Sequence, residues 1–131
     1  MPGSFSDFLE NELLDHLFPT SASYSRPTNI FAGLYTAVPS DAGGGTEVSG
    51  NGYARVTLDS WNVASSGVVD NSAVITFATA TASWNTLMAI GLFDTSSAGN
   101  LLAWMTVTTF KVVGTNDVAR FAAGAVRVTL D

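Results

Sequence analysis

Residues 87–108 have the sequence LMAIGLFDTSSAGNLLAWMTVT, which consists of two apolar runs separated by a polar loop. The runs, residues 87–94 and 101–108, are rich in aliphatic and aromatic side chains. The loop, TSSAGN at residues 95–100, has the small and polar residues that are typical of turns. Two short apolar runs joined by such a loop predict a β-hairpin.

Similar short runs of β-forming residues occur on both sides of this hairpin, separated by turns rich in Gly, Asn, Asp and Ser. They span residues 29–38, 53–58, 73–78, 109–113, 118–122 and 125–130. Strands do not alternate with helices along the chain, so a parallel sheet is not expected. The pattern predicts a mostly β protein whose fold is an antiparallel β-sandwich resembling a jelly roll.

One segment differs, because its apolar residues recur at the 3.6-residue period of a helix. These residues are Phe5, Phe8, Leu9, Leu13, Leu17 and Phe18. Ser4 and Asp7 have the spacing of a capping box, and Pro19 ends the pattern. We therefore expect one N-terminal amphipathic helix from Ser4 to Phe18. It would form a helical arm, residues 1–20, ahead of a β-sandwich domain, residues 21–131.

The chain is poor in charge, since only 12% of its 131 residues are Asp, Glu, Lys or Arg, against about 25% in an average protein. The net charge is −6, and five Lys and Arg residues are too few for a surface that binds nucleic acid or anionic lipid. No apolar run approaches the ~20 residues of a membrane span. Low charge favours large protein–protein contacts; the alternative is a soluble monomer with a neutral Ser- and Thr-rich coat.

The residue types that catalysis and metal binding require are scarce. Cys is absent and His16 is the only histidine, so neither a Cys nucleophile nor a zinc site is expected. Most acidic residues fall in predicted turns, where Asp commonly bonds its own backbone. A hydrolase would need two carboxylates brought together from distant loops. The composition predicts a non-enzymatic protein without a cofactor or metal.

Residues 40–47, SDAGGGTE, contain three consecutive glycines: Gly43, Gly44 and Gly45. A phosphate-binding P-loop needs a Lys and a following helix, whereas this segment has no Lys and precedes a predicted strand. The main interpretation is a long mobile turn between strands. Two alternatives stay open, namely a loop that contacts a ligand and a Ca²⁺ site that uses Asp41 and Glu47.

Three Trp residues are candidates for binding or for packing. Trp61 and Trp84 fall near the ends of predicted strands, where their rings could be exposed and line a sugar-binding surface. Trp104 lies inside an apolar run and is expected in the core. Core packing and interface contact are the commoner uses of aromatic side chains, so we favour them over a sugar platform.

Several segments carry a family resemblance. They are SDFLENELLDHLF (residues 6–18), GLYTAVPSDAGGGTEVSGNGYAR (33–55), NSAVITFATA (71–80), IGLFD (90–94), GNLL (99–102) and VRVTLD (126–131). In these segments the chain resembles small bacteriophage virion proteins labelled tail fibre proteins, and it is similar to capsid decoration (cement) proteins. AGGGTEVSGNGYAR is the most specific part. Phe31 and Leu87–Met88 depart from the family pattern. These differences are expected to affect packing and not membership of the family.

The resemblance implies a virion component made in many copies. The leading hypothesis is a capsid decoration protein that binds the major capsid protein on the outer head surface and stabilises contacts between capsid subunits. Closed symmetry favours a homotrimer. The helix would supply a contact stripe of Phe5, Phe8, Leu9 and Leu13, unless it covers the end of its own sandwich instead.

The alternative hypothesis places the chain on the tail of the virion. It would then be a fibre or receptor-binding module that attaches to a saccharide on the host surface. Trp61, Trp84 or the loop containing Gly43–Gly45 would form the tip that makes the contact.

Overall fold

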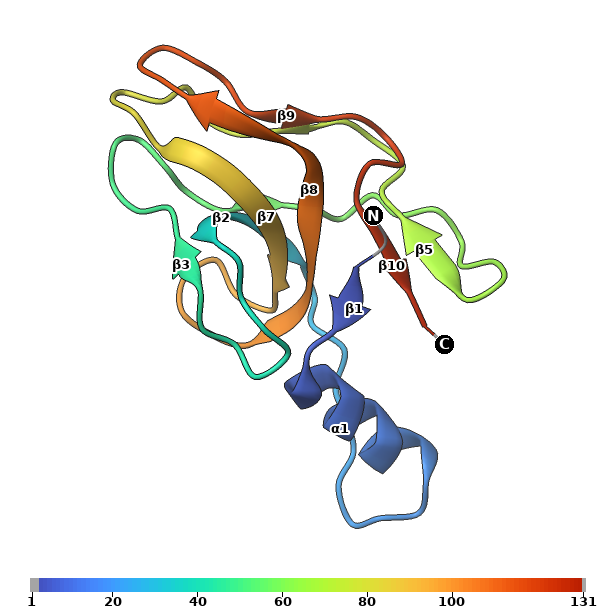
Figure 1. Cartoon of the computed structure of the whole chain (residues 1–131). Coiled ribbons are helices and arrows are strands. Elements are labelled where there is room, and N and C mark those ends of the chain that lie inside the picture. The colour runs from blue at the N-terminus through green and yellow to red at the C-terminus, as the bar shows by residue number, and fades with distance from the viewer. Residues whose placement is uncertain (1–2, 131) are drawn as a thin grey trace.

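A computed structural model describes residues 3–130 of the chain (Figure 1). Its largest element is a six-stranded antiparallel sheet with the strand order β1, β8, β7, β2, β3, in which β4 also pairs with β2. The bounds are β1 Ser4–Phe5, β2 Phe31–Ala37, β3 Thr46–Glu47, β4 Val56–Thr57, β7 Asn85–Phe93 and β8 Leu101–Val113. Residues 1, 2 and 131 of the predicted arm and sandwich domain lie outside the described residues.

Two small sheets pack against this main sheet. One pairs β5 (Val68–Asp70) with β10 (Arg127–Thr129), and the other pairs β6 (Ile75–Thr76) with β9 (Arg120–Phe121). Both pairings are antiparallel. The prediction of a mostly β, antiparallel, sandwich-like fold is therefore confirmed. The division into an arm and a domain at residue 20 stays a prediction.

Strands β7 and β8 form the hairpin that the sequence predicts, with Phe93 paired to Leu101 and Ile90 paired to Met105. The expectation of two strands at 101–108 and 109–113 is wrong, because β8 runs through both segments. Between the pairs Ala89–Thr106 and Leu87–Lys111, β8 advances five residues while β7 advances two. A bulge in β8 takes up the extra residues and lets the strand continue.

The core lies between the main sheet and the two small sheets. Alternate residues of β2, β7 and β8 point inward, and they meet side chains from the second layer. The buried residues of this cluster include Ala32, Leu34, Ile90, Leu92, Ala103 and Met105 from the main sheet, with Ile75, Phe77, Val126 and Val128 opposite them. Tyr35, Ala89 and Phe93 are buried on the other face of the sheet, so the central strands are apolar on both faces, which accounts for the apolar runs from which they were predicted.

The one helix, α1, spans Asp7–Leu17. The expected start at Ser4 is wrong, because Ser4 and Phe5 pair with Trp104 and Ala103 as strand β1. Ser6 is the N-cap instead, and its Oγ accepts a hydrogen bond from the backbone N–H of Leu9 at 3.3 Å.

Helix α1 extends away from the sandwich together with the loop that follows it (Figure 1). None of its residues is buried. An 11-residue helix is marginal in water on its own, so α1 depends on its few contacts with β1 and β8 or on a partner. No helix within residues 3–130 is long and apolar enough to cross a membrane.

Candidate functional site

A cleft of about 560 Å³ lies where the start of α1, the glycine-containing loop and the β7–β8 hairpin loop meet. Three segments that are far apart in sequence thus build one site. The cleft is lined by Ser6, Asp7, Phe8, Tyr35, Asp41, Ala42, Gly43, Gly44, Phe93, Gly99, Asn100 and Leu101. Of the residues expected to make contacts, it brings together Phe8, Gly43 and Gly44.

Two glycines make room for aromatic rings on the outer face of the main sheet, beside this cleft. Gly33 of β2 is paired with Gly91 of β7. A Cβ atom on Gly91 would lie 2.7 Å from the Tyr35 ring, and one on Gly33 would lie 2.9 Å from both Phe93 and Glu47. The missing side chains leave room for the rings of Tyr35 and Phe93, which stack with centroids 6.2 Å apart.

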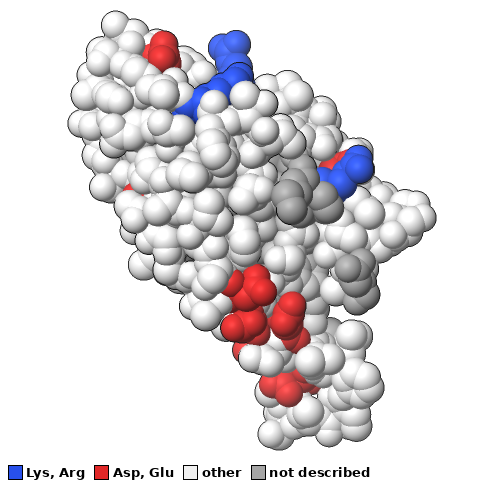
Figure 2. All heavy atoms as spheres, viewed as in Figure 1, with Lys and Arg blue, Asp and Glu red and all other residues white. Residues whose placement is uncertain are grey.

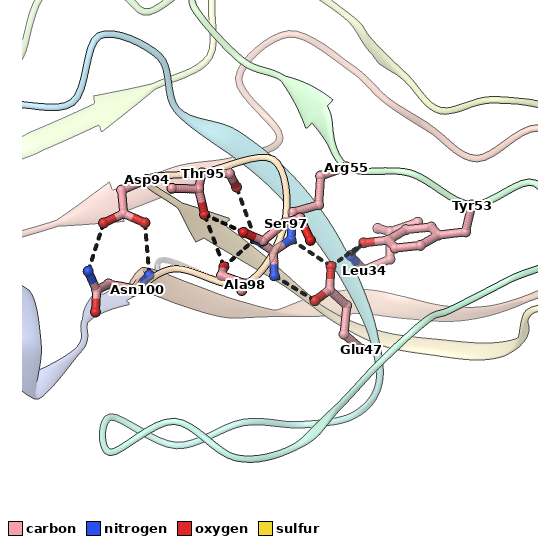
Figure 3. Close-up of polar contacts among 9 residues, drawn as sticks. All are labelled: Leu34, Glu47, Tyr53, Arg55, Asp94, Thr95, Ser97, Ala98 and Asn100. Carbon is pink, nitrogen blue, oxygen red and sulfur yellow. Dashed lines mark hydrogen bonds and ion pairs between the residues drawn. The ribbon is translucent and has the colours of Figure 1, made fainter.

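An ion-paired network, drawn in Figure 3, lies beside these rings, since the Arg55 guanidinium contacts the ring of Phe93. Arg55 binds both carboxylate oxygens of Glu47, with Nε to Oε1 and Nη2 to Oε2 each at 2.8 Å. The hydroxyl of Tyr53 donates to Glu47 Oε1 at 2.7 Å and accepts from the backbone N–H of Leu34 at 2.9 Å. The bidentate pair ties Arg55 to β3, and the hydrogen bond from Leu34 to Tyr53 ties the segment after β3 to the middle of β2.

Arg55 also fixes the hairpin loop. Its Nη1 donates to the carbonyl oxygens of Thr95 at 2.9 Å and Ala98 at 2.8 Å, as Figure 3 shows. Its Cζ lies 3.4 Å from the centroid of the Phe93 ring, a cation–π contact. At the base of the loop, Asp94 accepts hydrogen bonds from the backbone and side chain of Asn100, each at 2.8 Å. One arginine therefore holds the wall of the cleft in place.

The environment of the network sets its protonation. Burial alone would lower the pKa of Arg55, but the hydrogen bonds and the charge of Glu47 outweigh it, so the pKa is raised. Burial, followed by the hydrogen bond to Glu47, raises the pKa of Tyr53 far above its usual range. Arg55 is therefore a fixed cation and Tyr53 a fixed neutral hydroxyl, and the network performs a structural role.

The glycine loop is partly packed and partly open. The backbone groups of Ser40 and Gly43 bond each other in both directions at 2.9 Å, which closes a tight turn. Gly43, Gly44 and Gly45 all have positive φ. A Cβ on Gly45 would lie 2.6 Å from the carbonyl oxygen of Ala37, whereas Gly43 and Gly44 have no atom within 4 Å of that position.

This difference between neighbouring glycines gives a prediction. Gly45→Ala is expected to cost about 2–3 kcal/mol, because the backbone strain of positive φ adds to a clash with Ala37 and Pro39. Gly44→Ala, with similar φ but open space, is expected to cost only about 1 kcal/mol. Urea unfolding of both variants measures the difference. Equal losses would contradict the packing of Gly45 against β2.

The two carboxylates of the suggested Ca²⁺ site have separate partners. Glu47 is bound to Arg55 and Tyr53. Asp41 Oδ1 accepts hydrogen bonds from Nε1 of Trp104 at 2.9 Å and from Oγ of Ser4 at 3.4 Å. In the described part of the chain, no three His, Cys, Asp or Glu side chains lie together as metal ligands would. The suggestion of a Ca²⁺ site formed by Asp41 and Glu47 is withdrawn, since Arg55 already neutralises Glu47.

Core or interface packing was the favoured interpretation of the tryptophans, with exposed rings of Trp61 and Trp84 as the alternative. Trp84 is 2% exposed, and its Nε1 donates to the carbonyl of Asn51 at 2.9 Å, so Trp84 packs in the core and the alternative of an exposed contact is wrong for it. Trp61 is half-buried, with Nε1 donating to Leu58 at 2.8 Å. Trp104, expected in the core, is half-buried beside Asp41. Trp84 directly precedes β7 and still packs in the core, so proximity to a strand end did not predict exposure.

The four residues expected to form the contact stripe of the helix have different surroundings in the structure. Phe5 belongs to β1 and packs against the protein's own core. Phe8 lines the cleft, while Leu9 and Leu13 are half-buried. The most exposed apolar side chains of this region are Leu14, Leu17 and Phe18, at 55%, 73% and 61%. Leu17 and Phe18 fit the helical period of the sequence, but they were not predicted as contact residues.

Charge is unevenly distributed over the surface (Figure 2). Asp and Glu gather at the lower end, over α1 and the adjoining loop, and most of the remaining surface is uncharged. Helix α1 carries Asp7, Glu10, Glu12 and Asp15 and no Lys or Arg. Lys and Arg atoms lie at the upper edge, where Figure 1 places the end of β8 and β9, and at the right side, near β5 and β10.

The family model described as "Gp80: Podophage GP4 fiber I protein gp80" matches residues 4–129. No curated protein matches the chain. The matched range contains β1, α1, the cleft, the Arg55 network and all three tryptophans.

Proposed function

The chain belongs to the family of the podophage GP4 fiber I protein gp80, and on that premise we propose that it is a non-enzymatic structural subunit of a fibre on the phage particle. Membership of the family makes it a structural protein of a phage. The match over residues 4–129 carries the proposal, because it spans nearly the whole folded body and not one isolated motif.

The chemistry of the cleft supports a structural role. Asp41, which lines the cleft, is bound by Trp104 and Ser4. Glu47, which lies in the network beside the cleft, is bound by Arg55 and Tyr53. A carboxylate held by an arginine fork is a poor general base, since its charged form is stabilised. The network instead makes a rigid end of the sandwich on which a neighbouring subunit can rest.

Decoration of the head is the second candidate, and the surface favours it. Only 12% of the residues are charged, and Figure 2 shows broad uncharged areas. Such areas lose little hydration when they are covered, which suits a protein that lies flat on the major capsid protein. The homotrimer expected from symmetry fits either location and is part of both candidates.

Phage particles assembled without this chain distinguish the two candidates. The fibre proposal expects stable, filled heads that lack fibres in negative-stain micrographs and adsorb poorly to cells. Adding the purified chain back is expected to restore both fibres and adsorption. Particles with intact fibres and heads that rupture at lower temperature would contradict the fibre proposal and support head decoration.

A further inference from the structure

The sandwich is open along one edge, between the second half of β8 and the segment that contains β9. A groove of about 550 Å³ runs there, and buried core residues form part of its lining, among them Leu87, Ile90 and Met105. Its volume lies in the range of about 300–1,000 Å³ of sites that hold small ligands, so it has room for two or three side chains. Apolar surface at this depth is a place where a partner gains free energy by inserting side chains.

The groove has a cationic rim. Lys111 and Arg120, two of the five Lys and Arg residues of the chain, line it together with the acidic Asp117. Asp117 is engaged locally, because its carboxylate accepts a hydrogen bond from the backbone N–H of Gly114 at 2.8 Å. Val112 and Val118, which are 68% and 38% exposed, complete the apolar part of the rim.

Helix α1 has the complementary properties. Its last turn presents Leu14, Leu17 and the C-cap Phe18 to solvent, beside a helix with four acidic residues and no Lys or Arg. Figure 1 places α1 and the β8–β9 edge at opposite ends of the molecule, so the helix of one copy does not reach its own groove. The acidic and basic ends are likewise separated in Figure 2.

We propose that the last turn of α1 of one copy docks in the β8–β9 groove of a second copy. Leu17 and Phe18 would enter the groove, and the acidic face of α1 would lie beside Lys111 and Arg120. An amphipathic helix in an apolar groove is a common recognition mode. Because the two surfaces differ, the contact is head-to-tail, and it generates a ring if the rotation closes or a filament if it does not.

Two double variants and a control test this with the purified full chain, independently of where the chain lies on the virion. The helix variant Leu17→Ser/Phe18→Ser changes side chains that are exposed in the single copy, so folding is retained. The groove variant Lys111→Glu/Arg120→Glu reverses the charge of the groove rim from positive to negative. Each is expected to raise the dissociation constant of self-association at least about tenfold in sedimentation velocity experiments. Val63→Ser, at a side chain 94% exposed outside both surfaces, is the control and is expected to assemble like the unchanged chain.

Mixing the two defective variants gives the decisive result. The groove variant keeps an intact α1, and the helix variant keeps an intact groove, so one productive contact remains between them. The mixture is expected to form a one-to-one dimer and nothing larger, with circular dichroism showing that both variants are folded. An unchanged chain that stays monomeric, variants that assemble normally, or a mixture that stays monomeric would each overturn the proposal.

Discussion

Arg55→Ala is expected to lower the free energy of unfolding by about 3 kcal/mol or more, one of the two largest effects predicted for this protein. The side chain of Arg55 is only 7% exposed, and that of Glu47 is 25% exposed. Removing the arginine leaves the half-buried negative charge of Glu47 without a cation to neutralise it. It also removes the donors to Thr95 and Ala98, which hold the hairpin loop.

Urea unfolding followed by tryptophan fluorescence measures this loss. Arg127→Ala is the matched control, since Arg127 forms the other ion pair among the described residues, with Asp70, and is 54% exposed. Surface pairs contribute little, so this control is expected to change stability only slightly. Arg55→Lys should fall between the two, because lysine keeps the charge but lacks the planar fork. Similar stability of the Arg55→Ala and Arg127→Ala variants would contradict a structural role for the network.

Trp84→Ala is expected to lower the free energy of unfolding by about 3–5 kcal/mol, the range for truncating a large buried aromatic residue. The indole is 2% exposed, meets the Tyr53 ring edge-to-face with centroids 5.5 Å apart, and donates to Asn51. The substitution therefore opens a cavity in the core and removes one of the two hydrogen bonds to the carbonyl of Asn51, leaving only the one from the backbone N–H of Thr81.

Trp61→Ala provides the comparison, because Trp61 is only half-buried and packs at the margin of the core. Its loss of stability is expected to be clearly smaller in the same urea experiment. The structure argues against an exposed, contact-making Trp84. It would be contradicted by a Trp84→Ala variant that is as stable as the unchanged chain but fails to attach to its partner on the virion or the host.

The long strands could be predicted from the sequence, and the short ones only in part. Strands β2, β7 and β8 have seven, nine and thirteen residues, enough for their apolar runs and the polar hairpin loop to be recognised. Strands β4, β6, β9 and β10 have two or three residues but lie within longer predicted runs of β-forming residues. Strands β3 and β5, of two and three residues, were missed because they lie among turn residues and are too short to show a pattern. The start of α1 was placed too early because Phe5, which fits the helical period, is held in a strand by β8.

The candidate site was predicted only in part, for a related reason. The sequence singled out the glycine loop and the motif that ends in Tyr53 and Arg55, and both contribute to the site. Glu47, which binds both Arg55 and Tyr53, lies in the same stretch of sequence, but the carbonyls of Thr95 and Ala98 that Arg55 also binds lie 40 and 43 positions away. Contacts of this separation depend on how strands pair across the sheet, which composition and spacing do not specify.

Gold-antibody labelling of this chain on intact virions, viewed by electron microscopy, tests the central claim most directly. A fibre subunit is expected to carry label on fibres projecting from the particle, with the surface of the head unlabelled. A control antibody against the major capsid protein should label the head of the same particles. Label from this chain spread evenly over the head, with bare fibres, would contradict the fibre assignment and identify the chain as a head decoration protein.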